Sequence, residues 1–243
     1  MTEPLIEVHD DATALATAVA GALVARLADA QERGEEPQVA LTGGSIADQL
    51  HHQLTRLGND HGTDWARVVF WWGDERFVAR GSDERNAGAA RAAFLDPVGA
   101  DPGKVHEVPA ADEVDDVAAA AAAYATTLRE HGSGEFEVVL LGVGPDGHVA
   151  SLFPGHPALD DEGIAVAVTD SPKPPPQRVS LTFNALNRAR TVWFIVSGEA
   201  KAEAVAKALA EHPPADPHEV PAAGVTGSVE TVWFLDRESA SKL

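Results

Sequence analysis

The chain has 243 residues, no cysteine and a formal net charge of −20, from 18 basic and 38 acidic side chains. Without cysteine there is no disulfide, no thiolate metal site and no cysteine nucleophile. The acidic balance argues against nucleic acid or an anionic membrane as a partner, because both need a basic surface. No apolar stretch approaches the ~18–20 residues of a membrane span, and Met1 to Asp10 lack a signal core, so we expect a cytoplasmic protein.

The first half of the chain alternates predicted strands with predicted helices. Short apolar runs predict strands at residues 5–8, 39–41 and 68–72. The first helix can be capped by Asp10 or Asp11. Helical spacing gives this helix the apolar face Leu15, Val19, Leu23 and Leu27, and gives a second helix the face Ile46, Leu50, Leu54 and Leu57.

The second half continues the alternation. Helices are predicted over 114–129, with Val117, Ala121, Tyr124 and Leu128 on one face, and over 199–209. Strands are predicted at 138–141, 164–168, 192–196 and 232–235, and Pro213 to Pro221 is typical of a surface loop. This alternation predicts an α/β fold with a largely parallel sheet and helices on both faces. We expect one domain over residues 1–243.

Two polar segments directly follow predicted strands. In Thr42-Gly43-Gly44-Ser45, glycine N–H groups can bind an anion and Ser45 can cap the next helix or contact a ligand. A plain strand-to-helix turn has the same pattern. Gly73-Asp74-Glu75-Arg76 places two carboxylates and a guanidinium after the next strand, where an idle surface ion pair is the alternative. Ligands of open α/β sheets bind at the carboxyl ends of the strands, which favours a site here.

Residues 142–155 are the strongest single indication of a site. They begin with a match to G-x-G-x-x-G, and Asp170 ends the next strand like a ribose-binding acid. Pro154-Gly155 stops any helix within two turns, which argues against a dinucleotide loop. His148, with Asp146 beside it, suits a general base near neutral pH. A hydrogen-bonded structural histidine is the alternative.

A lysine and an arginine flank a proline run between Lys173 and Arg178. Polyproline geometry would hold these cations in fixed positions, and an acidic protein that binds an anion needs such a cluster. An exposed loop or a ligand for a partner domain is the alternative. The histidines show no metal-binding spacing: His51 and His52 are placed on an exposed part of a helix, and His212 and His218 in the proline loop. We therefore expect no metal site.

Taken in order, these motifs resemble the 6-phosphogluconolactonase family. The matching segments are 41–45, 72–77 with Asn86, 141–155, 173–182 with Leu186-Asn187, and 232–236, and they span nearly the whole chain. One departure is Ile46-Ala47 after Gly-Gly-Ser, where the family has Thr or Ser and then Pro. The resemblance implies a Rossmann-like α/β fold shared with glucosamine-6-phosphate deaminases and ribose-5-phosphate isomerases.

The resemblance also implies an activity and roles for single residues. It implies hydrolysis of 6-phospho-D-glucono-1,5-lactone to 6-phosphogluconate in the oxidative pentose phosphate pathway, without a metal or organic cofactor. His148 would transfer the proton, and Asp146 or Asp74 would orient its ring or a sugar hydroxyl. The implied phosphate ligands are Arg76, Lys173 and Arg178, and the residues implied to line the ligand site are Gly43, Gly44, Ser45 and Asn86.

Two other functions fit such a chain. A glucosamine-6-phosphate deaminase or isomerase shares part of the Asp-Gly-His turn, but Leu-Phe-Pro-Gly and Lys-Pro-Pro-Pro favour the lactonase. A non-catalytic sugar-phosphate sensor would need an added DNA-binding region, for which the chain has neither the length nor the basic charge. We expect a small phosphorylated sugar lactone as the partner, no nucleic acid or membrane, and a monomer or weak homodimer.

Overall fold

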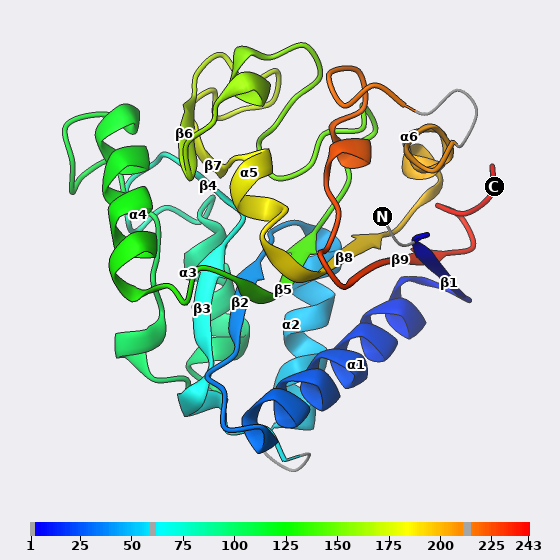
Figure 1. Cartoon of the computed structure of the whole chain (residues 1–243), viewed down its shortest axis with the longest axis horizontal. Coiled ribbons are helices and arrows are strands. Elements are labelled where there is room, and N and C mark those ends of the chain that lie inside the picture. The colour runs from blue at the N-terminus through cyan, green and yellow to red at the C-terminus, as the bar shows by residue number, and fades with distance from the viewer. Residues whose placement is uncertain (1–2, 59–61, 211–214) are drawn as a thin grey trace.

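The computed structural model describes residues 3–58, 62–210 and 215–243, and a parallel sheet lies at its centre (Figure 1). The six strands are β1 (Leu5–His9), β2 (Gln38–Leu41), β3 (Val69–Trp72), β5 (Phe136–Leu141), β8 (Ala189–Val196) and β9 (Glu230–Asp236). Their order is β1-β9-β8-β5-β2-β3, and every neighbouring pair is parallel. The predicted parallel α/β fold is confirmed.

Helices cover both faces of this sheet because several of its strands are buried on both sides. β2, β3 and β5 are buried along their whole length, and successive residues point to opposite faces. Val39 and Leu41 join a core with α1 (Ala12–Glu32) and α2 (Ser45–Leu57). Ala40 joins a second core, on the other face, with α4 (Val117–His131) and α6 (Ala202–Ala208).

The carboxylate of Asp11, rather than that of Asp10, caps α1 by accepting from the N–H groups of Thr13 and Ala14 at 2.9 and 2.8 Å. α1 corrects one expectation. Among the described residues it is the one helix that is long and apolar enough, by length and composition, to cross a membrane. Its predicted apolar face is buried, and the helix packs against α2 and β9, as a core helix does.

A second sheet, which the sequence pattern does not predict, is built from three short strands. β4 (Asp74–Arg76), β7 (Arg178–Leu181) and β6 (Ala165–Val168) pair antiparallel in the order β4-β7-β6. The strand predicted at 164–168 therefore lies outside the parallel sheet. Residues 74–76, expected to follow a strand, and Arg178, expected on an extended proline segment, belong to strands, and their register places Arg76 opposite Arg178.

Several element boundaries also differ from the prediction. The helix expected at 114–129 is α4 at Val117–His131, with the predicted face buried. The helix expected at 199–209 divides into a 3₁₀ helix, Glu199–Lys201, followed by α6. Two short helices, α3 (Asn86–Ala90) and α5 (Phe183–Leu186), were not expected from the pattern. Helices of four or five residues are too short to show the apolar period on which the prediction depends.

Two expectations about single segments are wrong, and one lies outside the described residues. His51 is 2% exposed and stacks on Phe94 with ring centres 5.8 Å apart, so it does not lie on an exposed part of α2. Residues 172–176 form a series of bends with a cis peptide bond between Pro174 and Pro175, rather than a polyproline helix. Residues 211–214, which contain His212 and the start of the predicted proline loop, are not among those described.

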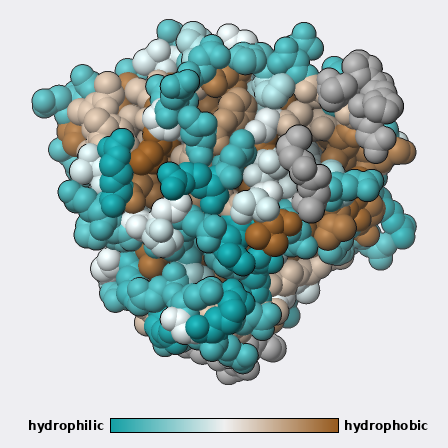
Figure 2. Space-filling view, in the orientation of Figure 1, coloured by the Kyte–Doolittle hydropathy of each residue, from teal (hydrophilic) through white to brown (hydrophobic). Residues whose placement is uncertain are grey.

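The surface agrees with the acidic composition. The face in Figure 2 is mostly hydrophilic, and hydrophobic atoms gather near the place of β1 in Figure 1. β1 is an edge strand, and its side chains Leu5, Ile6 and Val8 are exposed.

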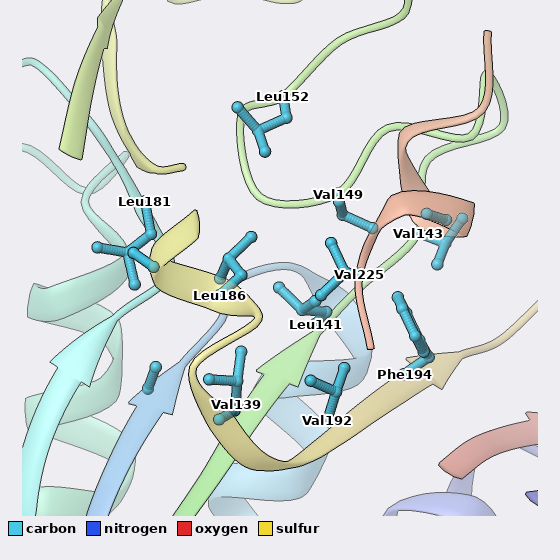
Figure 3. Close-up of a cluster of buried hydrophobic side chains, with 14 of the residues drawn as sticks. Val139, Leu141, Val143, Val149, Leu152, Leu181, Leu186, Val192, Phe194 and Val225 are labelled. Atoms are coloured by element: carbon cyan, nitrogen blue, oxygen red, sulfur yellow. The ribbon is translucent and has the colours of Figure 1, made fainter. Parts of the chain in front are cut away.

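Apolar side chains anchor the loop that follows β5. Val149 and Leu152 of this loop lie in the same buried cluster as Leu141 and Val143 (Figure 3). The loop contains turns and an isolated bridge between Val149 and Leu152, and no long helix follows it. The loop therefore lacks the long helix that a dinucleotide-binding loop requires, as the sequence predicts.

Candidate active site

The candidate site lies at the carboxyl ends of the parallel strands. From β2 the chain continues to β3 on one side of the sheet, and from β5 it continues to β8 on the other side. Such a divergence between neighbouring strands opens a crevice in an open α/β sheet. Here the loops after β2, β5 and β8, together with β4, line a cavity of about 300 Å³.

Nine of the ten predicted site residues line this cavity. They are Gly43, Gly44, Ser45, Asp74, Arg76, Asn86, His148, Lys173 and Arg178. The tenth, Asp146, contacts the ring of His148. The structure therefore brings all ten residues into one site, although they come from separate segments of the chain.

His148 and Asp146 form a close pair. Nδ1 of His148 and Oδ1 of Asp146 are 2.5 Å apart, whereas Asp74 bonds to a different group. A carboxylate only accepts hydrogen bonds, so Nδ1 carries the proton and Nε2 of the neutral ring holds a lone pair. Burial acts to raise the pKa of Asp146, but the hydrogen bond from His148 and the charge of Lys173 lower it to about 2. Asp146 is therefore ionised at neutral pH.

Three neighbours confine the imidazole of His148. The centre of the Phe153 ring lies 4.7 Å from the centre of the imidazole, and Nζ of Lys173 lies 3.5 Å from Nδ1. A Cβ atom at Gly144 would lie 2.0 Å from two atoms of the same ring. Only glycine at position 144 leaves room for the ring where it lies.

Asp74 and Glu75 hold the wall of the cavity together. Oδ2 of Asp74 accepts from Oγ of Ser151 at 2.6 Å. Glu75 is fully buried and accepts from the backbone N–H groups of Arg76, Asn86 and Ala87 at 2.8 to 2.9 Å. Burial raises the pKa of Glu75, and the N–H groups that it accepts from oppose this rise. Glu75 thereby joins β4 to the start of α3.

Arg76 and Asn86 meet beside the Gly-Gly-Ser loop. Nη1 of Arg76 donates to Oδ1 of Asn86 at 2.5 Å, and a Cβ atom at Gly43 would lie 1.9 Å from this Oδ1 atom. Gly44 has φ of +96° and is the N-cap of α2, which has no side-chain cap. Ser45 is therefore the first residue of α2 and lines the cavity, rather than capping the helix.

The bends at residues 172–176 surround the guanidinium of Arg178. Its Nη2 donates to the carbonyls of Pro174 and Lys173 at 2.9 and 3.3 Å, and its Nε donates to that of Pro175 at 3.2 Å. Arg178 is 6% exposed. The proline segment does hold two cations at the site, but carbonyl groups rather than polyproline geometry fix the arginine.

Sequence reasoning missed two polar residues of the cavity that follow β8, Ser197 and Lys201. The signal was present, because Ser197-Gly198 is a polar turn between a predicted strand and a predicted helix, like Thr42 to Ser45. Burial and then the charge of Lys173 lower the pKa of Lys201. Burial likewise lowers the pKa of Lys173, where the charge of Arg178 adds to the effect and Asp146 opposes it.

Four cations thus converge on the cavity: Arg76, Lys173, Arg178 and Lys201. Within residues 3–58, 62–210 and 215–243, none of the four lies within 4.0 Å of a carboxylate oxygen. Unpaired like charges in a partly buried site repel one another, so the cavity favours an anion. No cluster of three or more His, Asp or Glu residues suited to a metal ion occurs in the described part of the chain.

The chain is similar in sequence and in structure to known proteins of one family. A family model for glucosamine-6-phosphate isomerases/6-phosphogluconolactonase matches residues 10–233. A 6-phosphogluconolactonase of Streptomyces coelicolor is 44% identical, over 99% of this chain and 95% of the relative. The crystal structure of 6-phosphogluconolactonase from Thermotoga maritima has a TM-score of 0.84 at 27% identity and covers 96% of this chain and 99% of that one.

A monomeric glucosamine-6-phosphate deaminase shares the fold at 19% identity, with a TM-score of 0.82 over 98% of this chain and 100% of that chain. The predicted similarity in fold to glucosamine-6-phosphate deaminases is confirmed. The similarity to ribose-5-phosphate isomerases stays a prediction. The match over residues 10–233 and the 44% identity to a lactonase of nearly the same length settle the relationship. The chain belongs to the glucosamine-6-phosphate isomerase/6-phosphogluconolactonase family.

Proposed function

We propose that this protein is a 6-phosphogluconolactonase, which hydrolyses 6-phospho-D-glucono-1,5-lactone to 6-phosphogluconate. The observation that carries this proposal is the His148–Asp146 pair in a cavity with four cations that have no carboxylate partner among the described residues. The histidine can act as the general base that activates water for hydrolysis, and the cations can bind a phosphate group. The similarity to lactonases of the family supports the same choice.

His148 is the general base and acid of the proposed reaction. Its Nε2 takes a proton from water, and the water oxygen bonds to the lactone carbonyl carbon to give a tetrahedral oxyanion. As the oxyanion collapses, the bond to the ring oxygen breaks, and this oxygen takes the proton from Nε2. Asp146 holds Nδ1–H and stabilises the imidazolium between the two steps. Arg76 or backbone N–H groups of a glycine-rich loop stabilise the oxyanion.

The phosphate is held by Arg76, Lys173, Arg178 and Lys201. A phosphate dianion relieves the repulsion that lowers the pKa of Lys201 beside Lys173. Gly43, Gly44 and Ser45 add N–H groups at the N-terminus of α2, which also favours an anion. Asn86 fixes the guanidinium of Arg76. Binding through this phosphate places the lactone carbonyl against His148.

The runner-up functions are a glucosamine-6-phosphate deaminase or isomerase and a non-catalytic sugar-phosphate-binding protein. Both would use the same cations, and neither needs a lactone. We further propose that the enzyme is cytoplasmic, acts as a monomer or weak homodimer, and needs no metal or organic cofactor.

The test is a coupled assay on freshly generated 6-phosphogluconolactone, with glucosamine-6-phosphate and ribose-5-phosphate as alternative substrates. We expect loss of the lactone well above its spontaneous rate and no turnover of the two other sugars. Turnover of glucosamine-6-phosphate alone would assign the protein to the deaminases. Binding of 6-phosphogluconate without turnover of any substrate would indicate a sensor.

A further inference from the structure

Asp236 is a buried carboxylate for which the proposed chemistry has no role. It is the last residue of β9 and is 3% exposed. β9 runs parallel to β8 with Leu235 paired to Val196, so Asp236 stands beside the turn that follows β8. A buried charge is stable only where hydrogen-bond donors surround it. The donors around Asp236 therefore show which segment of the chain its carboxylate fixes.

Those donors belong mainly to the turn Ser197-Gly198. Oδ2 of Asp236 accepts from Oγ of Ser197 at 2.6 Å, and its two carboxylate oxygens lie 3.1 and 3.0 Å from the N–H nitrogen of Gly198. Oδ1 also accepts from the N–H of Ser239 at 2.8 Å. Burial acts to raise the pKa of Asp236, but the hydrogen bonds from Ser197, Ser239 and Gly198 lower it, so the charge is kept.

This turn determines where the chain goes after β8. Gly198 has φ of +96°, in the region that favours glycine, and the 3₁₀ helix Glu199–Lys201 begins at the next residue. Lys201 reaches the cavity from this helix, and Ser197 lines the cavity as well. The carboxylate of Asp236 therefore accepts from the backbone N–H of Gly198, three residues before Lys201, the cation that we propose to bind phosphate.

We propose that Asp236 is a positioning residue for phosphate binding, because it fixes the Ser197-Gly198 turn and thereby places Lys201 in the cavity. The inference rests on the proposed function only in that the cavity binds phosphate. Asp236 touches no substrate atom and acts through Lys201. Its own negative charge would weaken phosphate binding, so loss of positioning and loss of charge have opposite effects on affinity.

The test compares Asp236→Asn and Asp236→Glu with the control Ser239→Ala. The first variant removes the charge, and the second keeps it but moves the carboxylate. The control removes the hydroxyl of Ser239, which donates to the carbonyl of Val196 and accepts from the N–H of Asp236. It keeps the hydrogen bonds of the Asp236 carboxylate with Ser197 and Gly198. We expect both Asp236 variants to raise KM for the lactone, and Kd for inorganic phosphate by calorimetry, roughly tenfold. We expect kcat to stay within about twofold, because the phosphate is held equally in the ground state and in the transition state.

The control should lower Tm without changing KM or Kd, which separates positioning from a merely structural contribution. A double-mutant cycle tests whether Asp236 acts through Lys201, because in a Lys201→Met background the Asp236→Asn change should no longer raise Kd. An unchanged or lower Kd in a folded Asp236 variant, or a full effect in that background, overturns the proposal. If the wild type binds phosphate but does not hydrolyse the lactone, the proposed function fails while the phosphate Kd still tests Asp236.

Discussion

The two ends of the parallel sheet carry cavities of opposite character. At the amino ends of β2 and β5, a cavity of about 390 Å³ is lined by apolar side chains such as Leu128 and Phe136 and by polar ones that include two glutamates and a single cation, Arg188. The cavity at the carboxyl ends is smaller, about 300 Å³, and contains His148 and four cations. Strand direction, rather than cavity size, thus distinguishes the candidate site from the other cavity, because the loops at the carboxyl ends bring a histidine and four cations together.

The largest expected effect is at His148. We expect His148→Gln to lower kcat/KM by ~10²–10⁴-fold, because the proposed proton transfer is lost. The measurement is the coupled lactone assay, with the phosphate Kd as a check on binding. His52→Gln, on the exposed surface of α2, is the matched control and should keep full activity. Near-normal turnover of His148→Gln with unchanged Kd would contradict the proposed role of His148 in proton transfer.

The next effect is expected at Lys201. We expect Lys201→Met to raise KM and the phosphate Kd by about 10–100-fold, the size of one lost hydrogen bond to a charged group. The control is Lys207→Met, since Lys207 is 60% exposed and pairs with Glu203 at 2.9 Å. Equal KM values for the two variants would show that Lys201 lines the cavity without binding the phosphate.

A smaller effect, on stability, is expected at His51, a buried residue of α2 that stacks on Phe94. Burial, and then the charge of His52, lower the pKa of His51 to about 4, whereas an unfolded histidine has a pKa near 6.5. Below about pH 6.5 the unfolded chain therefore takes up a proton that the folded chain excludes, and the free energy of unfolding falls until about pH 4.

Urea unfolding at about pH 7 and about pH 5 measures this difference. Relative to His51→Leu, the wild type should lose about 2 kcal/mol more on acidification, since 1.36 kcal/mol accompanies each pH unit between the two pKa values. The leucine variant removes the titrating group and keeps an apolar side chain against Phe94. Parallel losses in both proteins would contradict the assignment.

The smallest effect is expected at the amino ends of the strands. Arg188→Ala should leave KM and kcat unchanged and alter the free energy of unfolding by no more than ~0.5 kcal/mol, because the side chain is exposed. The lactone assay and urea unfolding check this together. A rise in KM at this distance from His148 would show that the larger cavity is coupled to the site.

The sequence is informative about the site because the polar residues of the site come after predicted strands. Asp74, Arg76 and His148 are polar groups directly after apolar runs, and parallel strands bring such groups to one edge. The three-stranded sheet was not predictable, since β4 has only three residues and its partners depend on tertiary contacts. His51 was misplaced for a similar reason, because the aromatic ring that covers it comes from a distant segment.

The contact between Gly144 and the imidazole has a consequence for how the enzyme would evolve. The ring of His148 occupies the space of a side chain at position 144, and its contacts with Asp146 and Phe153, two residues of the same loop, orient it. A relative that bound a differently shaped lactone could change the distant cations one at a time. The pair of glycine and histidine would have to change together, so this part of the site is the least free to vary.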